Sequence, residues 1–557
     1  MEVPRESPRP RTFAGLLKPL LISSLVDLAL LLIVLVGHAV TNNPSLLTLA
    51  LLLTLGGGLL GASCIVVGTI WGIFRFPSHR WTIVFVILLT GGVLLAHGYV
   101  INSPPTQDCT VTDPTSNGCI MDEGVYYVPA AHLILNGTQC GLQNTTEVPS
   151  ACNLEHPFLG KAFVAAGMAI FGDNDVGYRF FEVILGTFSL PLLFLLALKV
   201  SGSRKLSAFA TLLLSFDVMF FAHSSAGLID VQQVFFILLA LVTYAYDLHF
   251  WRVDKHVVSG ALLGLAGLTK ETAVFGVLAV ATYVLIFGDG NLKHRSLSTM
   301  KMGVTLGGVF ILGLQLYDSL FASGTFPTFL GHLSFMVQYG STLTGPLLCS
   351  PDNAASSLAT GSYWCKFPGD PRIATPILPV DWLGYYAPVQ YYVDRICVIA
   401  TTSAGSCLGP SYIRVGYYGI TNLLVTWTVF AWIPLAGLTF YRLFRPAQAG
   451  PNTPSSGDTP SLEPAGETRL MGLAAIWFLW NYVPYYWVQY VLGRVTYPYY
   501  FVPAIPSLAL GAAYLISRRW FPNRLALGYL VVAFCFFFVF FPDKSFLPIN
   551  LRELIGR

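Results

Sequence analysis

The chain has 557 residues, of which 54% are hydrophobic and only 11% are charged, and its formal net charge at pH 7 is +3. This composition excludes a soluble enzyme of several domains, because soluble proteins carry about 25% charged residues. The small net charge, with no basic face outside the short loops, also argues against a nucleic-acid partner. The sequence therefore predicts an all-α polytopic membrane protein.

Long apolar stretches recur along the chain, and a helix needs about 20 apolar residues to cross the hydrocarbon core of a bilayer. The run 257–287 is long enough for two shorter spans, broken around Lys270 and Glu271. With it, the total is about 13 spans. The first stretch is longer than a signal-peptide core and has no clear cleavage site, so we expect it to stay as an anchor. The single spans are predicted at residues 16–40, 46–74, 82–101, 177–199, 206–222, 227–248, 302–322, 416–441, 469–490, 495–516 and 524–541.

Positive charges predict the orientation, because short cytoplasmic loops are enriched in lysine and arginine. Arg5, Arg9 and Arg11 place the N-terminus in the cytoplasm, and the later short basic loops alternate consistently with that start. Two long segments are then left outside, at 102–176 and 323–415.

The spans also suggest a domain organisation. Residues 1–81 are predicted to form an additional N-terminal transmembrane hairpin, 82–541 the main membrane domain and 542–557 a C-terminal tail. The Pro-, Gly- and Ser-rich stretch 445–467 has the composition of a flexible linker, and the topology places it in the cytoplasm.

Cysteine usage supports the two outer segments. Of the 10 cysteines, four lie in each outer segment, whereas Cys64 and Cys535 lie within predicted spans. Even numbers confined to outer segments indicate disulfides in an oxidising compartment. No CxxC spacing is present, which disfavours a zinc site. Four cysteines allow three connectivities, and the simplest pairs neighbours along the chain: Cys109 with Cys119, Cys140 with Cys152, Cys349 with Cys365 and Cys397 with Cys407.

Two N-glycosylation sequons fall in the first outer segment. They are Asn136-Gly-Thr and Asn144-Thr-Thr. Such acceptors belong on an outer surface, so they agree with the topology, although chance sequons are common.

An acidic pair, Asp122 and Glu123, stands in the first outer segment before a helix with Tyr126, Ala130 and Ile134 on one side. That side would let the helix lie along the membrane surface. One interpretation of the acids is that they only favour a helix N-terminus. The alternative is that they belong to a functional site.

More charged residues follow about thirty positions later. The stretch "LEHPFLGKAFVAAGMAIFG" contains Glu155, His156 and Lys161 at a helix start punctuated by Pro and Gly. The stretch "VGYRFFEVILG" then carries Arg179 into the start of a span.

This order of features resembles the protein O-mannosyltransferase family, polytopic GT-C-type glycosyltransferases that use a dolichyl-phosphate sugar. In that family an Asp-Glu pair opens the first outer loop, a His-Pro-Pro-Leu-Gly-Lys-like segment follows, and an arginine then leads a membrane helix. Here these features read as Asp122-Glu123, "HPFLGK" at 156–161 and Arg179.

The resemblance covers roughly residues 82 to 541 and depends on the order of several motifs. Three features depart from the family: two extra spans precede the core, Phe158 replaces the second proline, and the second outer segment is too short for a β-trefoil MIR domain. The last departure indicates a prokaryotic member, with an archaeal one as the first expectation. Further similar stretches are "FFAHSSAGLIDVQQVFFILLA" (220–240), "GLAGLTKETAVFG" around Lys270, "HLSFMVQYG" (332–340) and "RVTYPYYFVPAIPSLALGAAYL" (494–515).

The resemblance implies transfer of a sugar, mannose in the first instance, from a dolichyl or polyprenyl phosphate to Ser/Thr hydroxyls of proteins on the extracytoplasmic side. Such a transfer needs a base for the acceptor proton, and a carboxylate can serve. Asp122 is the first candidate for this base, with Glu123 beside it. A single base attacking opposite the leaving group implies inversion, by analogy with glycosidases.

Departure of a lipid phosphate requires cations aimed at the developing charge. Arg179 and Arg494, near the outer ends of spans, are the first candidates, because arginine can meet phosphate in a bidentate manner. His156 and Lys161 are expected to support them.

Glu155, Asp230 and Lys270 are further candidates for the substrate site. Structural alternatives remain for several candidates: Arg179 pairs with Glu182 on one helix face, Lys161 and Lys270 snorkel from span ends, Asp230 hydrogen-bonds Ser224 or Ser225, and Tyr497, Tyr499 and Tyr500 form an interfacial aromatic belt.

Two other function classes stay open, because a fold does not fix a function. A transferase that modifies a glycan or another lipid would share the donor site. A transporter should show paired broken helices in related halves, and no such symmetry is evident. The sequence requires no cofactor and no metal. It predicts a lipid-phosphate sugar donor, an acceptor protein and membrane lipid as partners, and a location in the cell membrane.

Overall fold

A computed structural model of the protein describes residues 79–103, 120, 122–136, 153–248, 253–342, 365–366, 375–384, 389–397, 411–444, 466–518 and 520–542. The chain divides into two compact units, Met1–Tyr99 and Val100–Arg557. The predicted boundary at 81/82, the two N-terminal spans, the linker 445–467 and the tail stay predictions, since they fall wholly or largely outside the described residues.

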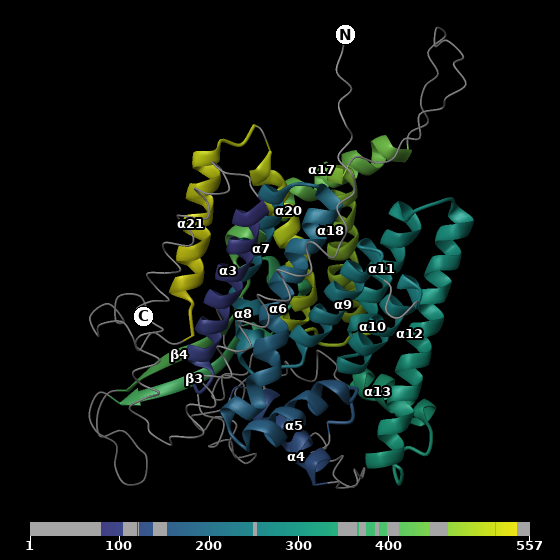
Figure 1. The fold of residues 1–557 in the computed structure, drawn as a ribbon. Helices are drawn as coiled ribbons and strands as arrows, with labels where there is room; N and C mark the ends of the chain where they lie inside the picture. Colours follow the sequence, from purple (N-terminus) through teal and green to yellow (C-terminus); the bar gives the residue numbers. More distant parts are fainter. Residues whose placement is uncertain are drawn as a thin grey trace, which may run out of the picture. The chain divides into compact units, whose positions relative to one another are not determined.

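Helices dominate the described part of the chain, so the predicted helical fold class is confirmed (Figure 1). The first unit contributes α3 (His79–Val100). The second unit contains η1 (Glu123–Tyr127), α4 (Val128–Leu135), α5 (Leu159–Phe171), α6 (Asp175–Ser201), α7 (Arg204–Ser215), α8 (Val218–Ser225), α9 (Asp230–Ala245), α10 (Lys255–Thr269), α11 (Ala273–Phe287), α12 (Leu292–Phe321), α13 (Phe329–Thr342), η2 (Pro379–Leu383), α16 (Leu423–Thr426), α17 (Val429–Phe444), α18 (Gly466–Tyr482), α19 (Pro484–Tyr490), η3 (Pro498–Ala504), α20 (Ile505–Ser517) and α21 (Asn523–Val539).

Five helices in the described residues are long and apolar enough to cross a membrane, or six if the bent pair α7 and α8 is one span. The predicted spans at α9, α11 and α21 are shorter apolar helices. The protein is an integral membrane protein, whereas the predicted total of about 13 spans stays a prediction. The five helices are Arg80–Val100, Asp175–Ser201, Leu292–Phe321, Leu423–Tyr441 and Pro498–Ser517.

The predicted span 206–222 is divided by a bend of 64° between α7 and α8. Asp217 caps α8, because its Oδ1 accepts a hydrogen bond of 2.9 Å from the Phe220 amide. Its Oδ2 accepts a hydrogen bond of 2.8 Å from the Asn422 amide. The Asn422 side chain donates in turn to the carbonyl oxygens of Phe216 and Ala533, at 2.9 Å each. The break is therefore built by a buried polar contact that joins four segments of the chain.

Helix α10 packs closely against α12 through two glycines four residues apart. A Cβ atom on Gly260 would lie 2.4 Å from the Met302 carbonyl oxygen, and one on Gly264 would lie 2.8 Å from Val309 Cβ. Small residues at this spacing let helices in a bilayer approach each other closely. Through this packing α10 brings its C-terminal end, where Lys270 lies, to a fixed position.

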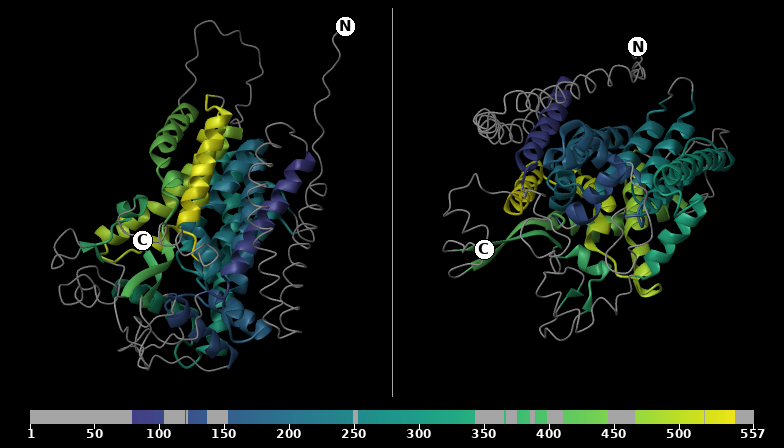
Figure 2. Two further views of the ribbon diagram at one scale, coloured as in Figure 1. Left: turned by 90° about the vertical axis from the view of Figure 1, so that its left-hand side faces the viewer. Right: turned by 90° about the horizontal axis from the view of Figure 1, so that it is seen from below.

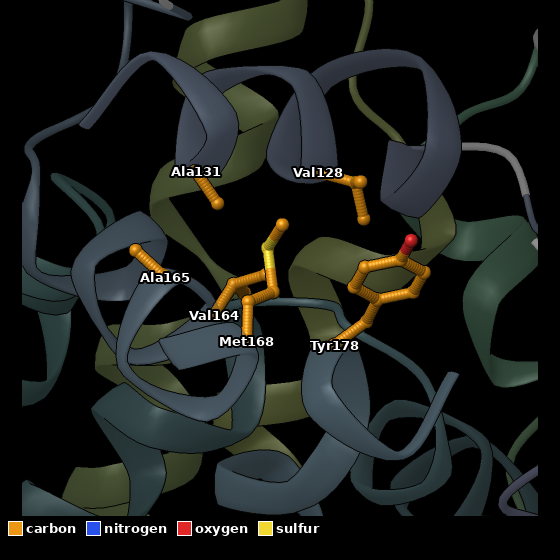
Figure 3. Packing of buried hydrophobic residues seen from close by; sticks show 6 residues of the cluster. All are labelled: Val128, Ala131, Val164, Ala165, Met168 and Tyr178. Atoms are coloured by element: carbon orange, nitrogen blue, oxygen red, sulfur yellow. The ribbon is translucent and has the colours of Figure 1, made fainter. Parts of the chain in front are cut away.

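The predicted helix after the acidic pair is present as the π-helical turn η1 followed by α4. Ala130 is buried, and Ile134 packs on an apolar cluster. Figure 3 shows this cluster between α4, α5 and the first turns of α6. It consists of Val128, Ala131, Val164, Ala165, Met168 and Tyr178.

Two antiparallel strand pairs were not expected, and the longer one continues past the predicted outer segment 323–415, so the predicted span 416–441 begins as a strand and is helical only from Leu423. The longer pair extends away from the helices of the second unit in both Figure 1 and Figure 2. The strands are β1 (Cys365–Lys366) with β2 (Thr375–Pro376), and β3 (Val389–Cys397) with β4 (Ser411–Gly419).

The disulfide prediction stays a prediction, because the side chains of all eight cysteines of the outer segments lie outside the described residues. Cys535, which was expected to be unpaired, is free and exposed on α21. Asn136 is exposed at the end of α4, whereas Asn144 lies outside the described residues.

We expect Gly260→Ala to lower the stability of the chain in detergent by about 1–3 kcal/mol, because the new methyl group must displace the Met302 backbone. The control is Gly303→Ala on α12, where a Cβ atom would meet nothing within 4 Å. Thermal unfolding of both variants in the same detergent makes the comparison. Equal midpoints would show that the close approach of α10 and α12 contributes no stability.

Candidate functional site

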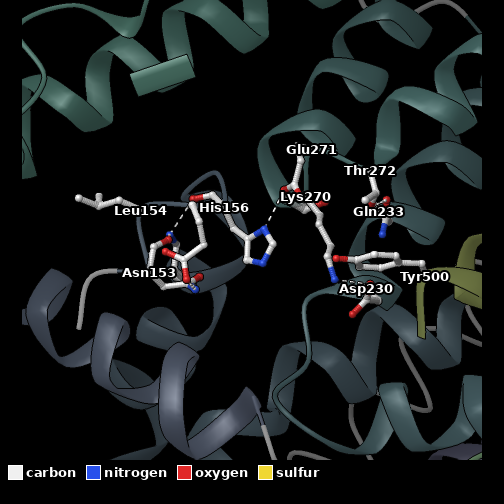
Figure 4. A network of polar contacts seen from close by, with 12 residues as sticks. Asn153, Leu154, His156, Asp230, Gln233, Lys270, Glu271, Thr272 and Tyr500 are labelled. Carbon is white, nitrogen blue, oxygen red and sulfur yellow. Dashed lines mark hydrogen bonds and ion pairs between the residues drawn. The ribbon is translucent and has the colours of Figure 1, made fainter. Parts of the chain in front are cut away.

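A polar cluster forms in the second unit from segments that are far apart in the sequence (Figure 4). The turn before α5, the first turn of α9, the connection between α10 and α11, and η3 each contribute side chains to it. Because these elements are held by helix packing, the cluster is built on a rigid frame.

The turn from Asn153 to His156 is held by its own buried side chains. Asn153 Nδ2 donates to Glu155 Oε1 at 2.8 Å. Lys161 is fully buried, and its ammonium donates to the carbonyl oxygens of Asn153 and His156. Burial lowers the pKa of Lys161 to about 8, against the raising effect of Glu155 and Glu271. The snorkelling alternative is excluded for Lys161, whose ammonium is bound to the backbone.

The connection between α10 and α11 joins this turn to the rest of the cluster. His156 Nδ1 donates to Glu271 Oε2 at 2.8 Å. The neighbouring Lys270 is fully buried, with its Nζ 2.6 Å from Asp230 Oδ1 and 5.0 Å from the centre of the Tyr499 ring. Lys270 therefore does not snorkel to the surface.

Asp230 is the first residue of α9, and two basic side chains lie close to its carboxylate. Besides Lys270, His223 Nδ1 lies 3.4 Å from Asp230 Oδ2. The alternative partners Ser224 and Ser225 instead donate to backbone carbonyl oxygens one turn earlier in α8. The sequence analysis thus named Asp230 and Lys270 as candidates, but it did not predict that they pair with each other.

Asp122 and Glu123 have different surroundings although they are adjacent. Glu123 is fully buried, and its Oε1 accepts a hydrogen bond of 2.7 Å from Arg179 Nε. Arg179, also fully buried, donates to the Ile101 carbonyl oxygen at 2.7 Å. The alternative pairing of Arg179 with Glu182 is not found. Glu182 accepts instead from the Gln232 side chain.

Asp122 is half-buried, and its carboxylate makes no capping hydrogen bond with the helix that follows. Burial raises the pKa of Asp122 to about 6, with Lys270 and His156 opposing this rise and Asp230 and Glu155 adding to it. Asp122 is thus not a capping residue, and its electrostatic neighbours are the polar cluster.

Arg494 lies beside the tyrosines of η3. It is half-buried, its Nη2 lies 3.3 Å from the Tyr500 hydroxyl, and its Nε has no hydrogen-bond partner. Tyr497, Tyr499 and Tyr500 are buried and in ring contact with one another, so they do not form an interfacial belt.

The sequence analysis did not predict a further buried pair, formed by Asp318 and His332. His332 Nδ1 lies 2.7 Å from Asp318 Oδ1, and His332 Nε2 donates to the Leu154 carbonyl oxygen at 2.8 Å. The available signals were an acid near the outer end of a predicted span, which is costly unless paired, and the histidine that opens "HLSFMVQYG".

The described residues contain no group of three or more His, Cys, Asp or Glu side chains that could hold a metal ion. The arrangement instead offers a half-buried carboxylate, two cations and several tyrosine rings, which suits proton removal and binding of an anion.

Comparison with known proteins identifies a family that part of the chain resembles. Residues 155–314 match the model of a family described as dolichyl-phosphate-mannose-protein mannosyltransferase. The predicted resemblance to the protein O-mannosyltransferase family is confirmed. The matched residues include the turn at His156 and the connection at Lys270, whereas Asp122 and Arg494 lie outside them.

Individual mannosyltransferases resemble the chain at low sequence identity. A polyprenol-phosphate-mannose--protein mannosyltransferase of Mycobacterium tuberculosis is 27% identical over 268 residues, which are 41% of this chain and 50% of the relative. The chain thus spans about half the length of this curated relative. Among solved structures, the S. cerevisiae protein O-mannosyltransferase Pmt1-Pmt2 complex bound to the sugar donor is similar with a TM-score of 0.49 and 14% identity, over 85% of this chain and 91% of that chain. ArnT from Cupriavidus metallidurans bound to undecaprenyl phosphate is similar with a TM-score of 0.45 and 15% identity, over 82% and 70% of the two chains.

We expect Arg179→Met to lower stability by about 3–5 kcal/mol, because it leaves a buried carboxylate without its cation. Adding Glu123→Gln should recover part of the loss. The exposed pair of Arg518 and Glu467 is the control, and Arg518→Met should cost less than about 1 kcal/mol. Unfolding in detergent measures all three variants against the wild-type chain. A double variant as unstable as Arg179→Met alone would contradict the pairing.

Proposed function

We propose that the chain transfers a sugar, mannose, from a dolichyl or polyprenyl phosphate sugar to Ser/Thr hydroxyls of proteins, with inversion at the anomeric carbon. The proposed location is the cell membrane, with the N-terminus in the cytoplasm and the site on the extracytoplasmic side. The family match and the name of the mycobacterial relative support the reaction class.

The observation that carries the proposal is the position of Asp122. Its carboxylate is half-buried, caps no helix and stands among charged groups of the cluster. A base works best when its pKa lies near the operating pH, and burial raises the pKa of Asp122 to about 6. Glu123 is engaged with Arg179, so we assign the base to Asp122 and a supporting position to Glu123.

Arg494 is our first candidate for the donor phosphate. Its Nε has no partner in the structure, and a guanidinium can offer a phosphate two parallel hydrogen bonds. Lys270 adds a second cation close to the same tyrosines. Binding of the phosphate by Arg179, Lys161 and His156 stays a prediction, since these side chains already contact Glu123, backbone carbonyls and Glu271.

In this reaction the acceptor oxygen attacks the anomeric carbon on the face opposite the phosphate. The acceptor proton passes to Asp122 as the new bond forms, and the bond between the anomeric carbon and the phosphate oxygen breaks. The lipid phosphate leaves with the bonding electrons, and Arg494 and Lys270 stabilise its charge. Asp230, which pairs with Lys270, and Glu155, an electrostatic neighbour of Asp122, complete the proposed substrate site.

We expect Asp122→Asn to reduce kcat about 10²–10⁴-fold, because the amide cannot take the proton. Affinity for the lipid-phosphate mannose should remain unchanged, since the phosphate meets the cations. The matched control is Asp173→Asn, an exposed acid of the same outer segment, which should retain normal turnover. Transfer to a Ser/Thr peptide in nanodiscs, with donor binding measured separately, gives both quantities. Normal turnover by Asp122→Asn would remove the assignment of the base.

The raised pKa of Asp122 also predicts the pH dependence. A base acts only when deprotonated, so kcat/KM should fall about tenfold per pH unit below pH 6. An ordinary aspartate would lose activity only near pH 4. The profile should be recorded from about pH 4.5 to 8.5 on the folded chain. The remaining activity of Asp122→Asn should lack this limb, and a wild-type kcat/KM that stays level down to the acidic end of this range would contradict the environment described for Asp122.

The acceptor class is tested by mass spectrometry of secreted proteins from cells with and without the chain. Loss of hexose from Ser/Thr residues supports protein glycosylation. Unchanged glycoproteins together with an altered glycan or lipid would instead identify the chain as a transferase of another acceptor.

A further inference from the structure

The dyad of Asp318 and His332 lies at the junction of three segments. Asp318 is in the last turn of α12, His332 is in the first half of α13, and Leu154 is in the turn before α5. Both side chains of the dyad are fully buried. The hydrogen bonds of His332 described here go to Asp318 and to the Leu154 carbonyl, so the dyad is linked to the proposed substrate groups through Leu154 and through α13.

The hydrogen bonds define the protons of the dyad. A carbonyl oxygen only accepts, so His332 Nε2 carries a hydrogen toward Leu154. The contact of 2.7 Å between Nδ1 and Asp318 Oδ1 requires a second hydrogen, on the nitrogen or on the carboxyl oxygen. The dyad is therefore neutral overall, and it holds the imidazole ring in one orientation.

Aromatic packing reinforces the same junction. Phe158, which stands where the family motif has its second proline, stacks on Tyr317 with ring centres 4.9 Å apart and planes 7° apart. Phe326 stacks on the His332 ring at 4.5 Å. The turn at Leu154 is thus fixed to α12 and α13 by a hydrogen bond and by ring contacts.

The other end of α13 reaches the proposed phosphate side. A Cβ atom on Gly340 would lie 3.1 Å from Arg494 Nη1, so the helix backbone passes directly beside the guanidinium. Tyr339 has Glu155, Arg494 and Asp122 among its electrostatic neighbours. One short helix therefore contacts both the turn that carries Glu155 and the loop that carries Arg494.

We propose that Asp318 and His332 are positioning residues: through the Leu154 carbonyl they fix the turn carrying Glu155 and His156 to α13, and α13 sets the place of that turn relative to Arg494. This proposal rests on the proposed function. A misplacement of reacting groups by about 1 Å can reduce the rate about 10²-fold, so the consequence falls on kcat rather than on donor binding.

Two amide variants of His332 separate positioning from simple stability. In His332→Gln the amide nitrogen stands near the place of Nε2 and can still donate to the Leu154 carbonyl, but Asp318 loses its partner. In His332→Asn the amide nitrogen stands near the place of Nδ1 and can still donate to Asp318, but the Leu154 carbonyl loses its donor. Because an unpaired buried acid is the more costly defect, His332→Gln should be the less stable variant.

The expected activities run in the opposite order. We expect His332→Asn to lose about 10- to 100-fold in kcat with an unchanged donor affinity, and His332→Gln to stay within about threefold of wild type. Amide hydrogen exchange of residues 153–161 should be faster in His332→Asn and near the wild-type rate in His332→Gln. Asp217→Asn, which perturbs a buried acid at the α7–α8 break, is the control and should lower stability without changing kcat.

The outcomes separate the two proposals. The first proposal is tested on a chain that transfers mannose. The positioning role would be overturned if kcat followed stability across the three variants. It would also be overturned if both His332 variants had the same kcat. Unchanged exchange of residues 153–161 in His332→Asn would overturn it independently of any transfer assay. A wild-type chain that transfers no mannose to any acceptor would overturn the proposed function itself.

Discussion

The need to pair every charge that is taken out of water governs the arrangement of this membrane protein. Removing a partner from a buried ion pair costs several kcal/mol, and the unit Val100–Arg557 contains such groups close together. Arg179 is paired with Glu123, and Lys270 with Asp230. Each pair joins two segments that are distant in sequence. The contacts that neutralise the charges are therefore the same contacts that assemble the site, and stability and geometry are not independent properties here.

The acidic pair shows how one dipeptide serves two purposes. Glu123 is enclosed and acts as the counter-ion of Arg179, whereas Asp122 keeps a half-buried carboxylate without a capping hydrogen bond. Successive residues of a helical turn point in different directions, so adjacent acids meet different surroundings. Two carboxylates with different environments take different protonation states and roles. The fixed position of Glu123 also fixes the backbone from which Asp122 extends.

Much of this could be predicted from the sequence. The long apolar stretches predicted where most helices lie, and the order of Asp122, His156 and Arg179 indicated the resemblance to the mannosyltransferase family, whose model matches residues 155–314. Which cation meets which acid could not be predicted, because the partners of Lys270 and Arg179 lie 40 and 56 residues away and are selected by helix packing. The residue types alone also did not show which partner each basic side chain contacts.

The tyrosines of η3 illustrate the same limit. An aromatic residue near a span end is usually interfacial, and only the packing of η3 against α9 and α18 shows that Tyr499 and Tyr500 are enclosed. Likewise, the sequence showed Phe158 only as a replacement of the second proline in the family motif. In the structure its ring stacks on Tyr317. Local sequence patterns predict the helical element, but the exposure of a side chain and the identity of each neighbour are properties of the assembled bundle.

The bend at Asp217 has a consequence for biosynthesis. The Asn422 amide that completes the hydrogen bonding of Asp217 is synthesised 205 residues later, which is roughly 10–40 s at ordinary rates of translation. During that interval the carboxylate has, among its backbone partners in the finished fold, the amides of its own helix start, Phe220 and Met219. The bent pair of α7 and α8 is therefore synthesised well before the residue that completes the hydrogen bonding at its break.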